Sequence, residues 1–354
     1  RPMTETPTRR RLAVVLFNLG GPDGPRAVRP FLKNLFSDPA IIDLPSPLRI
    51  PLANLIAAGR EQSAKANYAR MGGGSPILKE TQGQADALQA ALAAALPDLE
   101  TRCFIAMRYW KPYAAVAVSD VVAWGADKVV LLPLYPQFST TTTGSSLKSW
   151  KDAGGPPGVA VCCYPDAPKF IAAHAEKVLT AWQIAGKPPN VRTLLSAHGL
   201  PEIVVKSGDP YQWQVERTVA ALKRLLPSDW ETEICYQSRV GPLRWIGPPT
   251  EESITRAAKD GKTILVSPIA FVSEHIETLV ELDIDYRHVA EAAGARAYIR
   301  APALGVGAGF IETLAGLVED AAKDTAASTV RSSCGGRICP RDWRDCPNRR
   351  PVAA

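Results

Sequence analysis

Histidine is scarce in this chain, with only four residues among 354. Long apolar runs are also missing, because no stretch approaches the ~20 residues that a membrane-spanning helix needs. The N-terminus lacks the basic segment, apolar core and small-residue cleavage site of a secretory signal. These absences argue against a membrane-spanning protein, favour a cytoplasmic one, and make the few histidines candidates for chemistry.

Signatures of nucleotide and nucleic-acid binding are absent as well. The glycine turn at 72–74 lacks the lysine of a P-loop, and segment 18–22 lacks the Gly-x-Gly-x-x-Gly spacing of a dinucleotide site. The net charge of +6 is modest and comes partly from residues 9–11 and 337–350, so we expect no nucleic-acid partner. Seven cysteines are an odd number, which argues against a disulfide framework and fits a reducing compartment.

Short apolar runs alternate with helical stretches through most of the chain. Length and composition predict buried parallel strands at 12–17, 128–132, 191–195 and 262–266. Composition and helical spacing of apolar residues predict helices at 79–96, 167–183 and 211–226. The alternation predicts the α/β class, with parallel sheets flanked by helices.

Two pairs of segments resemble each other, 125–140 with 260–275 and 18–22 with 197–201. We therefore predict two Rossmann-like lobes with a central cleft, and ligands in such sheets lie beyond the carboxyl ends of the strands. The polar, Cys-, Gly- and Arg-rich tail has the composition of neither helix nor strand. The predicted units are an N-terminal arm (1–11), a first lobe (12–175), a second lobe (176–322) and a tail (323–354).

His198 directly follows a predicted buried strand and precedes a glycine and a proline at 199–201. At this edge of the sheet an imidazole can exchange a proton near neutral pH or bind a metal. The alternative is a histidine that caps the strand or bonds a backbone carbonyl. The position at a strand end in a Gly/Pro loop favours a functional role.

An acidic stretch runs from Glu274 to Asp285. If it opens an α-helix, Glu274, Glu277 and Glu281 share one face and suit a divalent cation or proton transfer. A solvated acidic helix face is the alternative. The hydroxyl run at 139–146 is similarly open, because it can bind an anion or only cap a helix.

Taken together, several stretches resemble the ferrochelatase family, whose members insert ferrous iron into protoporphyrin. The resemblance extends from residue 16 to about 318 and implies the two-lobed chelatase fold. The stretches that carry it, in the order found in the family, are 18–22, 68–76, 107–110, 134–139, 196–201, 236–248 and 273–283.

The resemblance implies that His198 and Glu277 are catalytic and lie on opposite sides of the porphyrin cleft. Removal of two pyrrole protons and delivery of a divalent cation suit an imidazole and a carboxylate. His198, Glu277 and Glu281 are then the residues expected to meet the metal, and Asp285 continues the acidic row. His198 as base and His198 as metal ligand both remain open, and His275 is expected to orient its neighbours.

Further matches are implied to surround the macrocycle. Apolar and aromatic walls with few polar groups suit a large conjugated ring. Arg60 and Ser75 are expected to meet the propionates, since guanidinium and hydroxyl groups bind carboxylates. The residues implied to bind porphyrin are Asn18, Leu19, Arg60, Tyr68, Ser75, Arg108, Tyr109 and Trp245.

The apolar segment 37–61 resembles the hydrophobic lip of the family. Its Ile, Leu and Pro residues, with Arg49 and Arg60 nearby, suit porphyrin access and shallow contact with a membrane surface. A core helix of the first lobe is the alternative. Shallow contact would make the protein peripheral at the inner face of the membrane.

Three cysteines, Cys334, Cys339 and Cys346, cluster in the tail. Their spacing suits structural zinc poorly, and the tail resembles that of ferrochelatases with a [2Fe–2S] cluster, which needs four ligands. Cys163 or Cys162 is the expected fourth ligand, because neighbours on a strand point to opposite faces and one of the two can be exposed. The family position that supplies this ligand in animals matches Ala173 here, which is a departure from the pattern. A cluster would be structural; a reduced tail without metal is the alternative.

The sequence therefore predicts a ferrochelatase that converts protoporphyrin IX and Fe²⁺ to haem with release of two protons. A non-catalytic porphyrin or haem carrier, and a chelatase for another metal and tetrapyrrole, are the alternatives. We expect a monomer or a homodimer.

Overall fold

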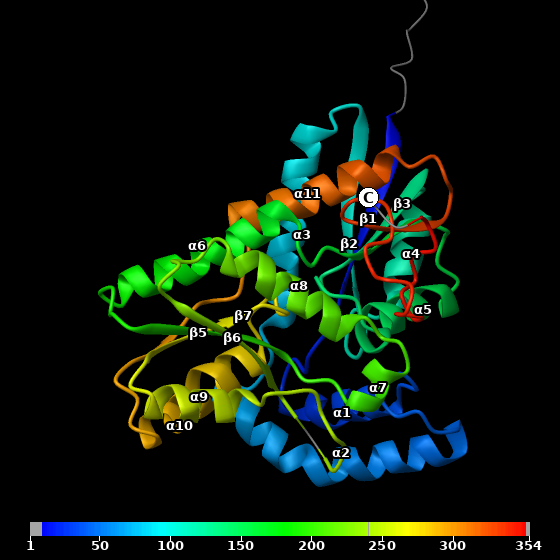
Figure 1. Ribbon diagram of the computed structural model, residues 1–354. Coiled ribbons are helices and arrows are strands. Elements are labelled where there is room, and N and C mark those ends of the chain that lie inside the picture. Colours follow the sequence, from blue (N-terminus) through cyan, green and yellow to red (C-terminus); the bar gives the residue numbers. More distant parts are fainter. Residues whose placement is uncertain (1–8, 240, 352–354) are drawn as a thin grey trace, which may run out of the picture.

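Two parallel sheets form the frame of the computed structural model, which describes residues 9–239 and 241–351 (Figure 1). The strand order is β2-β1-β3-β4-β9 in the first sheet and β6-β5-β7-β8 in the second. The first sheet comprises β1 (Arg10–Asn18), β2 (Leu99–Met107), β3 (Lys128–Pro133), β4 (Val159–Cys163) and β9 (Thr329–Ser332). The second comprises β5 (Val191–His198), β6 (Glu231–Gln237), β7 (Thr263–Pro268) and β8 (Tyr298–Arg300). The four predicted strands overlap β1, β3, β5 and β7, so the α/β prediction is confirmed.

Helices cover both sheets, as expected for parallel strands. The predicted helices at 79–96, 167–183 and 211–226 correspond to α3, α6 and α8. The first lobe contains η1 (Pro25–Ala27), α1 (Val28–Ser37), α2 (Ser46–Ala69), α3 (Ile77–Ala95), α4 (Ala114–Trp124), η2 (Thr140–Gly144) and α5 (Ser145–Asp152). The second half contains α6 (Pro168–Ile184), α7 (Glu202–Lys206), α8 (Tyr211–Lys223), α9 (Thr250–Lys259), η3 (Glu277–Asp285), α10 (Tyr286–Ala292) and α11 (Ala308–Lys323).

Side chains of β1 alternate between two apolar cores. Leu12, Val14 and Leu16 face a large core that also includes Leu195 and Leu265 of the second sheet. The intervening side chains of β1 face a smaller core beneath α4 and α5. This period of two is the pattern of a strand buried on both faces. The lobes therefore share one apolar core, which fixes how their carboxyl-end loops face each other.

The tail differs from its expectation. Residues 329–332 form β9, which pairs with β4 at the edge of the first sheet. This Thr-Val-Arg-Ser segment is short and precedes the Cys- and Gly-rich stretch, so composition alone concealed the strand. The pairing brings the cysteine region against the end of β4.

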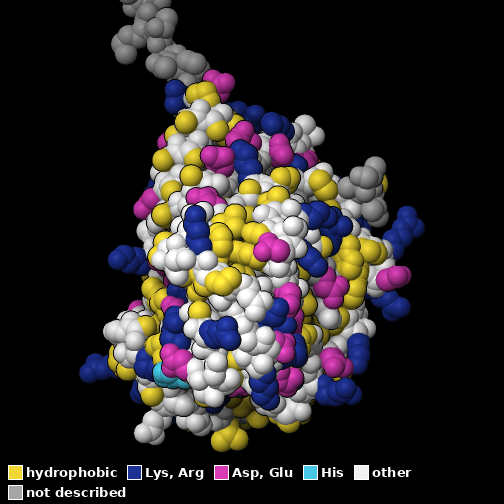
Figure 2. Space-filling model, turned by 60° about the vertical axis from the view of Figure 1, so that its left-hand side comes forward, with side chains coloured by type: hydrophobic (Ala, Val, Ile, Leu, Met, Phe, Trp, Pro, Cys, Tyr) yellow, Lys and Arg dark blue, Asp and Glu magenta, His cyan; other side chains and the backbone are white. Residues whose placement is uncertain are grey.

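The surface is mixed in charge. On the face shown in Figure 2, basic and acidic side chains are interspersed with small apolar patches rather than gathered by sign. No helix in the described part of the chain combines the length and apolar character needed to cross a bilayer.

Candidate active site

His198 is the last residue of β5, at the carboxyl end of the second sheet. Its Nδ1 lies 2.5 Å from the carbonyl oxygen of Gly199. A carbonyl oxygen can only accept, so Nδ1 carries a proton, and Nε2 is the ring nitrogen left to meet a proton or a metal. The side chain is 40% exposed, which leaves it accessible to a substrate.

Glu277 lies next to this nitrogen. It is the first residue of η3, and its Oε1 lies 3.7 Å from His198 Nε2. The resemblance implies that the two side chains lie on opposite sides of a cleft. Both instead project from the second lobe and share one wall, because η3 follows β7, the neighbour of β5 in the sheet.

Glu281 lies beside Glu277 and is held by several donors. The backbone N–H of Ser238, the Nε2 of Gln237 and the hydroxyl of Tyr286 donate to it at 2.9, 3.0 and 2.9 Å. The hydroxyl of Ser238 bonds Glu281 and lies 3.2 Å from an oxygen of Glu277. Burial, and then the charge of Glu277, raise the pKa of Glu281 above its ordinary value.

The rest of the acidic stretch points elsewhere. Glu274 precedes η3 and binds Arg300 at 2.9 Å, and Asp283 binds the same guanidinium at 2.8 Å. Asp285 binds Arg70 at 2.7 Å. The predicted single face of three glutamates is therefore wrong. Its α-helical spacing does not apply, because η3 is a π-helix with wider turns and begins only at Glu277.

His275 forms an aromatic row with Phe271 and His198. Its ring lies 4.7 Å from that of Phe271, which in turn lies 6.3 Å from the ring of His198. Burial lowers the pKa of His275, so this imidazole is neutral near pH 7. Its contact with Phe271 suits the predicted orienting role.

The first lobe brings Tyr68, Asn18 and Ser75 to this region. Tyr68 is buried near the end of α2, and burial followed by the charge of Glu277 raises the pKa of its hydroxyl. Asn18 ends β1, donates to Thr81 at 3.0 Å and accepts from the backbone N–H of Leu19. Ser75 donates its N–H to Pro22 at 2.7 Å, which closes the turn beside the Asn18 loop.

Two predicted porphyrin contacts are engaged inside the first lobe. Tyr109 is 1% exposed, and its hydroxyl donates to Asp38 at 2.7 Å. Arg108 binds the same carboxylate at 2.9 Å and donates to Ser145 at 2.6 Å. Tyr109 therefore does not line an open cleft in this conformation. Its position in the motif could not reveal the partner, because Asp38 lies 71 residues away.

Trp245 and Arg60 lie at the margins. Trp245 packs on the glycine after His198 and is half-buried. Arg60 is exposed on α2, with its guanidinium 5.7 Å from the centre of the Phe36 ring. Trp245 thus borders the His198 loop, whereas Arg60 is exposed to solvent on the lip.

Ser238 is a site residue that sequence reasoning missed. Its backbone has a φ of 61°, unusual for a residue with a side chain, and this turn aims both its N–H and its hydroxyl at the two glutamates. The signal was its place in the 236–248 motif, immediately after β6.

The hydroxyl run at 139–146 binds an internal carboxylate. Ser139 and Thr140 donate to the buried side chain of Asp209 at 2.9 and 2.7 Å. Ser139 also caps η2 by accepting from the N–H of Thr141. The run therefore both binds an anion and caps a helix, and the anion it binds is the protein's own Asp209.

The cysteines gather at the end of β4. Cys162 and Cys163 are buried with their sulfur atoms 3.5 Å apart, and Cys339 and Cys346 are close enough that their charges also raise the pKa of Cys163. Cys334 is exposed and adjoins β9. Within residues 9–239 and 241–351, no three His, Cys, Asp or Glu side chains are arranged to hold a metal ion as they stand.

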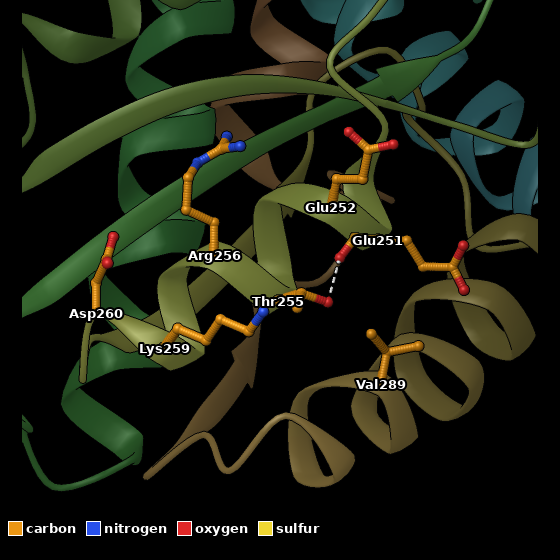
Figure 3. A pocket seen from close by; sticks show the side chains of 7 residues that line it. All are labelled: Glu251, Glu252, Thr255, Arg256, Lys259, Asp260 and Val289. Atoms are coloured by element: carbon orange, nitrogen blue, oxygen red, sulfur yellow. Dashed lines mark hydrogen bonds between the residues drawn. The ribbon is translucent and has the colours of Figure 1, made fainter.

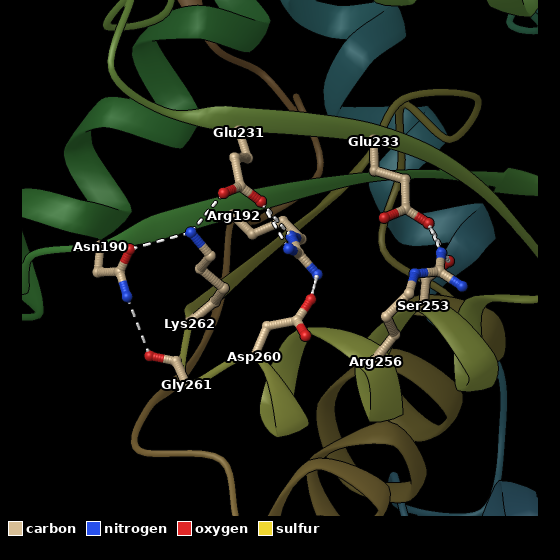
Figure 4. Close-up of polar contacts among 9 residues, drawn as sticks. All are labelled: Asn190, Arg192, Glu231, Glu233, Ser253, Arg256, Asp260, Gly261 and Lys262. Atoms are coloured by element: carbon tan, nitrogen blue, oxygen red, sulfur yellow. Dashed lines mark hydrogen bonds and ion pairs between the residues drawn. The ribbon is translucent and has the colours of Figure 1, made fainter.

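Two further surface features, a groove and an ionic network, lie away from His198 and Glu277. A groove of about 530 Å³ between α9 and α10 is lined by acidic and basic side chains with Thr255 and Val289 (Figure 3). At the amino ends of β5 and β6, Arg192 bridges Glu231 and Asp260 in an exposed ionic network (Figure 4). That edge is opposite the one that carries His198.

Comparisons with known proteins point to one family along most of the chain. The family model described as Ferrochelatase matches residues 11–322. A Ferrochelatase from Hyphomonas neptunium is 59% identical, with 96% of this chain and 95% of that protein aligned. One from Caulobacter vibrioides is 58% identical over 98% and 99%. Among solved structures, SirB from Bacillus subtilis with Fe³⁺ superposes with a TM-score of 0.51 at 13% identity, over 88% of this chain and 96% of that one, which supports the chelatase fold.

Proposed function

The chain belongs to the ferrochelatase family and inserts Fe²⁺ into protoporphyrin to give haem, and from that premise we propose that His198 and Glu277 carry the reaction. The observation that supports this assignment is the distance of 3.7 Å between His198 Nε2 and Glu277 Oε1. A proton or a cation placed between these two atoms would interact with both. The family match favours this reaction over a porphyrin carrier or another chelatase.

The distance between His198 Nε2 and Glu277 Oε1 suits both a divalent cation and a proton. A divalent ion bound about 2.1 Å from each atom would span the gap at an angle of about 120°. A pyrrole proton taken by Nε2 would give an imidazolium beside the Glu277 carboxylate, and these opposite charges attract. His198 can therefore act as the base for one pyrrole proton, and Glu277 can meet the metal or the second proton. Glu281, oriented by Ser238, extends this set.

The porphyrin lies against this wall in our proposal. Tyr68, from the first lobe, is close enough to Glu277 that the charge of Glu277 helps to raise the pKa of its hydroxyl. We therefore place the edge of the macrocycle near both side chains. Asn18, Leu19, Ser75 and Trp245 flank that path. Arg108 does not touch the macrocycle in this proposal; it binds Asp38 and Ser145 and so holds the segment around Tyr109 in place. Arg60, on the lip, binds a propionate.

The test is zinc insertion into protoporphyrin, followed by loss of the free-base absorption spectrum. His198→Ala is expected to lose turnover by about 10²-fold or more, the contribution typical of a general acid or base. The matched control is His288→Ala, because His288 is exposed on α10. Wild-type turnover in His198→Ala would disprove the assignment.

We also propose a [2Fe–2S] cluster bound by Cys334, Cys339, Cys346 and Cys163, with Cys162 as the alternative fourth ligand. The support is electrostatic. Arg337 is buried, and its guanidinium donates to the carbonyl oxygens of Cys339, Pro340 and Trp343. A buried cation bound to neutral carbonyls calls for nearby negative charge, which thiolates would supply. The cluster would staple the tail to β4 and take no part in metal insertion.

Absorption spectroscopy of protein purified without oxygen tests the cluster. A visible band of an oxidised [2Fe–2S] centre is expected, and Cys339→Ser should abolish it. Cys103→Ser is the control, since Cys103 lies on β2 away from the tail. A colourless wild-type preparation would contradict the proposal.

The lip is our proposed membrane contact. On α2 and the turn before it, large apolar side chains are exposed, and Leu48 and Leu55 reach 62% and 71%. Few residues of α2 are buried, which disfavours the core-helix alternative. Co-sedimentation with anionic vesicles should fall in Leu48→Asp with Leu55→Asp and not in Val122→Asp, an equally exposed apolar position on α4. Equal binding by both proteins would reject this contact.

A further inference from the structure

One ion pair joins the end of α2, the helix that begins in the lip, to η3, which carries Glu277. Arg70 immediately follows α2 in the first lobe, and Asp285 ends η3 in the second. Their side chains meet at 2.7 Å, with 33% and 45% exposed. We propose that Arg70 and Asp285 are positioning residues whose ion pair latches the end of α2 to η3 and slows exchange of the porphyrin. The inference rests on the proposed porphyrin position between Tyr68 and Glu277.

The pair stands at the ends of the segments that carry the reacting groups. Tyr68 lies two residues before Arg70, and Glu277 opens the helix that Asp285 closes. Ile276, just before Glu277, packs against the apolar cluster that contains Tyr68. Separation of Arg70 from Asp285 would therefore move Tyr68 relative to Glu277.

The opposite end of the lip is anchored more firmly. Asp38, in the turn before α2, is buried and binds Arg108 and Tyr109 within its own lobe. After Arg70 the chain passes through Gly72 and Gly73, whose φ values are 95° and 94°. At the Arg70 end, by contrast, the exposed Arg70–Asp285 pair and the packing of Ile276 on the Tyr68 cluster hold α2 to the second lobe.

The strength of the latch suits release. Exposed ion pairs change an equilibrium by only about 1.5-fold to fivefold, and salt screens them. A buried pair would hold the macrocycle too long for turnover. A latch of this kind therefore changes porphyrin affinity and dwell time more than the chemical step.

The test measures dissociation of metal-free protoporphyrin from the full chain by stopped-flow fluorescence, with excess albumin as the acceptor. Arg70→Ala and Asp285→Ala should each raise the dissociation rate about 1.5-fold to fivefold. The charge swap Arg70→Asp with Asp285→Arg should restore it towards the wild-type rate. At about 1 M salt, where the Debye length is about 3 Å, wild type and variants should converge.

A matched control removes an exposed ion pair within one lobe. Glu100→Ala breaks the Arg11–Glu100 pair, which is 3.1 Å long and 40% and 49% exposed, and should leave the rate unchanged. Wild-type rates in both single variants, or an equal rise in Glu100→Ala, would overturn the latch. Failure of the swap to restore the rate would also overturn it, because the effect would then come from other contacts of the two side chains and not from their ion pair.

The readout is independent of the catalytic assignment. Dissociation of metal-free porphyrin requires no turnover, so it can be measured in His198→Ala as well. Loss of the salt-dependent latch with intact catalysis rejects only this inference. Turnover that survives in His198→Ala rejects only the proposed function. In zinc insertion, the latch variants should raise KM and leave kcat within about twofold of wild type.

Discussion

Ser238 offers a direct test of how the carboxylate pair works. Its hydroxyl bonds Glu281 and also lies 3.2 Å from Glu277. Ser238→Ala removes this bridge and keeps the backbone turn. We expect the variant to require a higher pH for activity, because the hydroxyl stabilises the charged form of Glu281.

The size of the shift can be worked from the contacts. A hydrogen bond to a charged group contributes about 1.5–3 kcal/mol, and about 1.4 kcal/mol corresponds to one pKa unit. Glu281 retains the Ser238 N–H, Gln237 and Tyr286 as donors, each at 2.9–3.0 Å. The lower end of the range therefore applies. The acid limb of the rate profile should move upward by about one pH unit.

The assay is kcat/KM for zinc insertion, measured from acidic to neutral pH with protoporphyrin. The sign follows from the pKa of Glu281, which burial and Glu277 already raise above its ordinary value. Loss of a donor to the carboxylate raises it further, so protonation begins at higher pH. Activity at alkaline pH should approach that of the wild type.

Ser238→Gly separates the hydroxyl from the backbone strain. Glycine adopts the φ of 61° without cost and keeps the N–H that donates to Glu281. If the hydroxyl matters, both variants should shift alike. An unshifted acid limb in both would refute the reasoning, and a shift in alanine alone would assign the effect to strain.

Three further predictions follow from single contacts. Burial lowers the pKa of His174 to about 3, so folding stability should fall as pH drops below about 6.5, by about 2 kcal/mol at pH 5, and urea titration should show a smaller loss in His174→Leu. Asp38→Asn leaves the Arg108 guanidinium without its buried partner and should lower the free energy of unfolding by about 3 kcal/mol; an unchanged urea midpoint would contradict this. Tyr211→Phe removes the hydrogen bond to the His198 carbonyl oxygen, at 3.0 Å, and should lower kcat about fivefold with KM unchanged; a change in KM alone would argue against it.

The sheets could be predicted because parallel strands buried on both faces are continuous apolar runs. The runs at 12–17 and 191–195 fall within β1 and β5 for this reason. β2, β4, β6 and β8 were not among the predicted strands, and neither was β9, whose edge position requires little burial. Its partner β4 is distant in sequence, so no local pattern marked the pairing.

The site was predictable at the level of residue type and less so in geometry. His198 lies at a strand end, where the sequence placed it, because a strand end and its loop are local features. The prediction that three glutamates share one face assumed an α-helix. The pattern of polar residues does not distinguish an α-helix from the wider π-helical turns of η3. The orientation of Tyr109 is set by its hydrogen bond to Asp38. Asp38 is distant in sequence, so the spacing of residues around Tyr109 could not reveal it.

The arginines separate Glu277 and Glu281 from the rest of the acidic stretch. Arg300 pairs with both Glu274 and Asp283, and Arg70 pairs with Asp285. Within the described residues, Glu277 and Glu281 have no such Lys or Arg partner among the ion pairs. Metallation exchanges one divalent cation for two protons, so the total charge beside these carboxylates is the same before and after. A wall with two uncompensated carboxylates can therefore favour arrival of the metal without opposing departure of the protons, provided the protons leave along the same side chains.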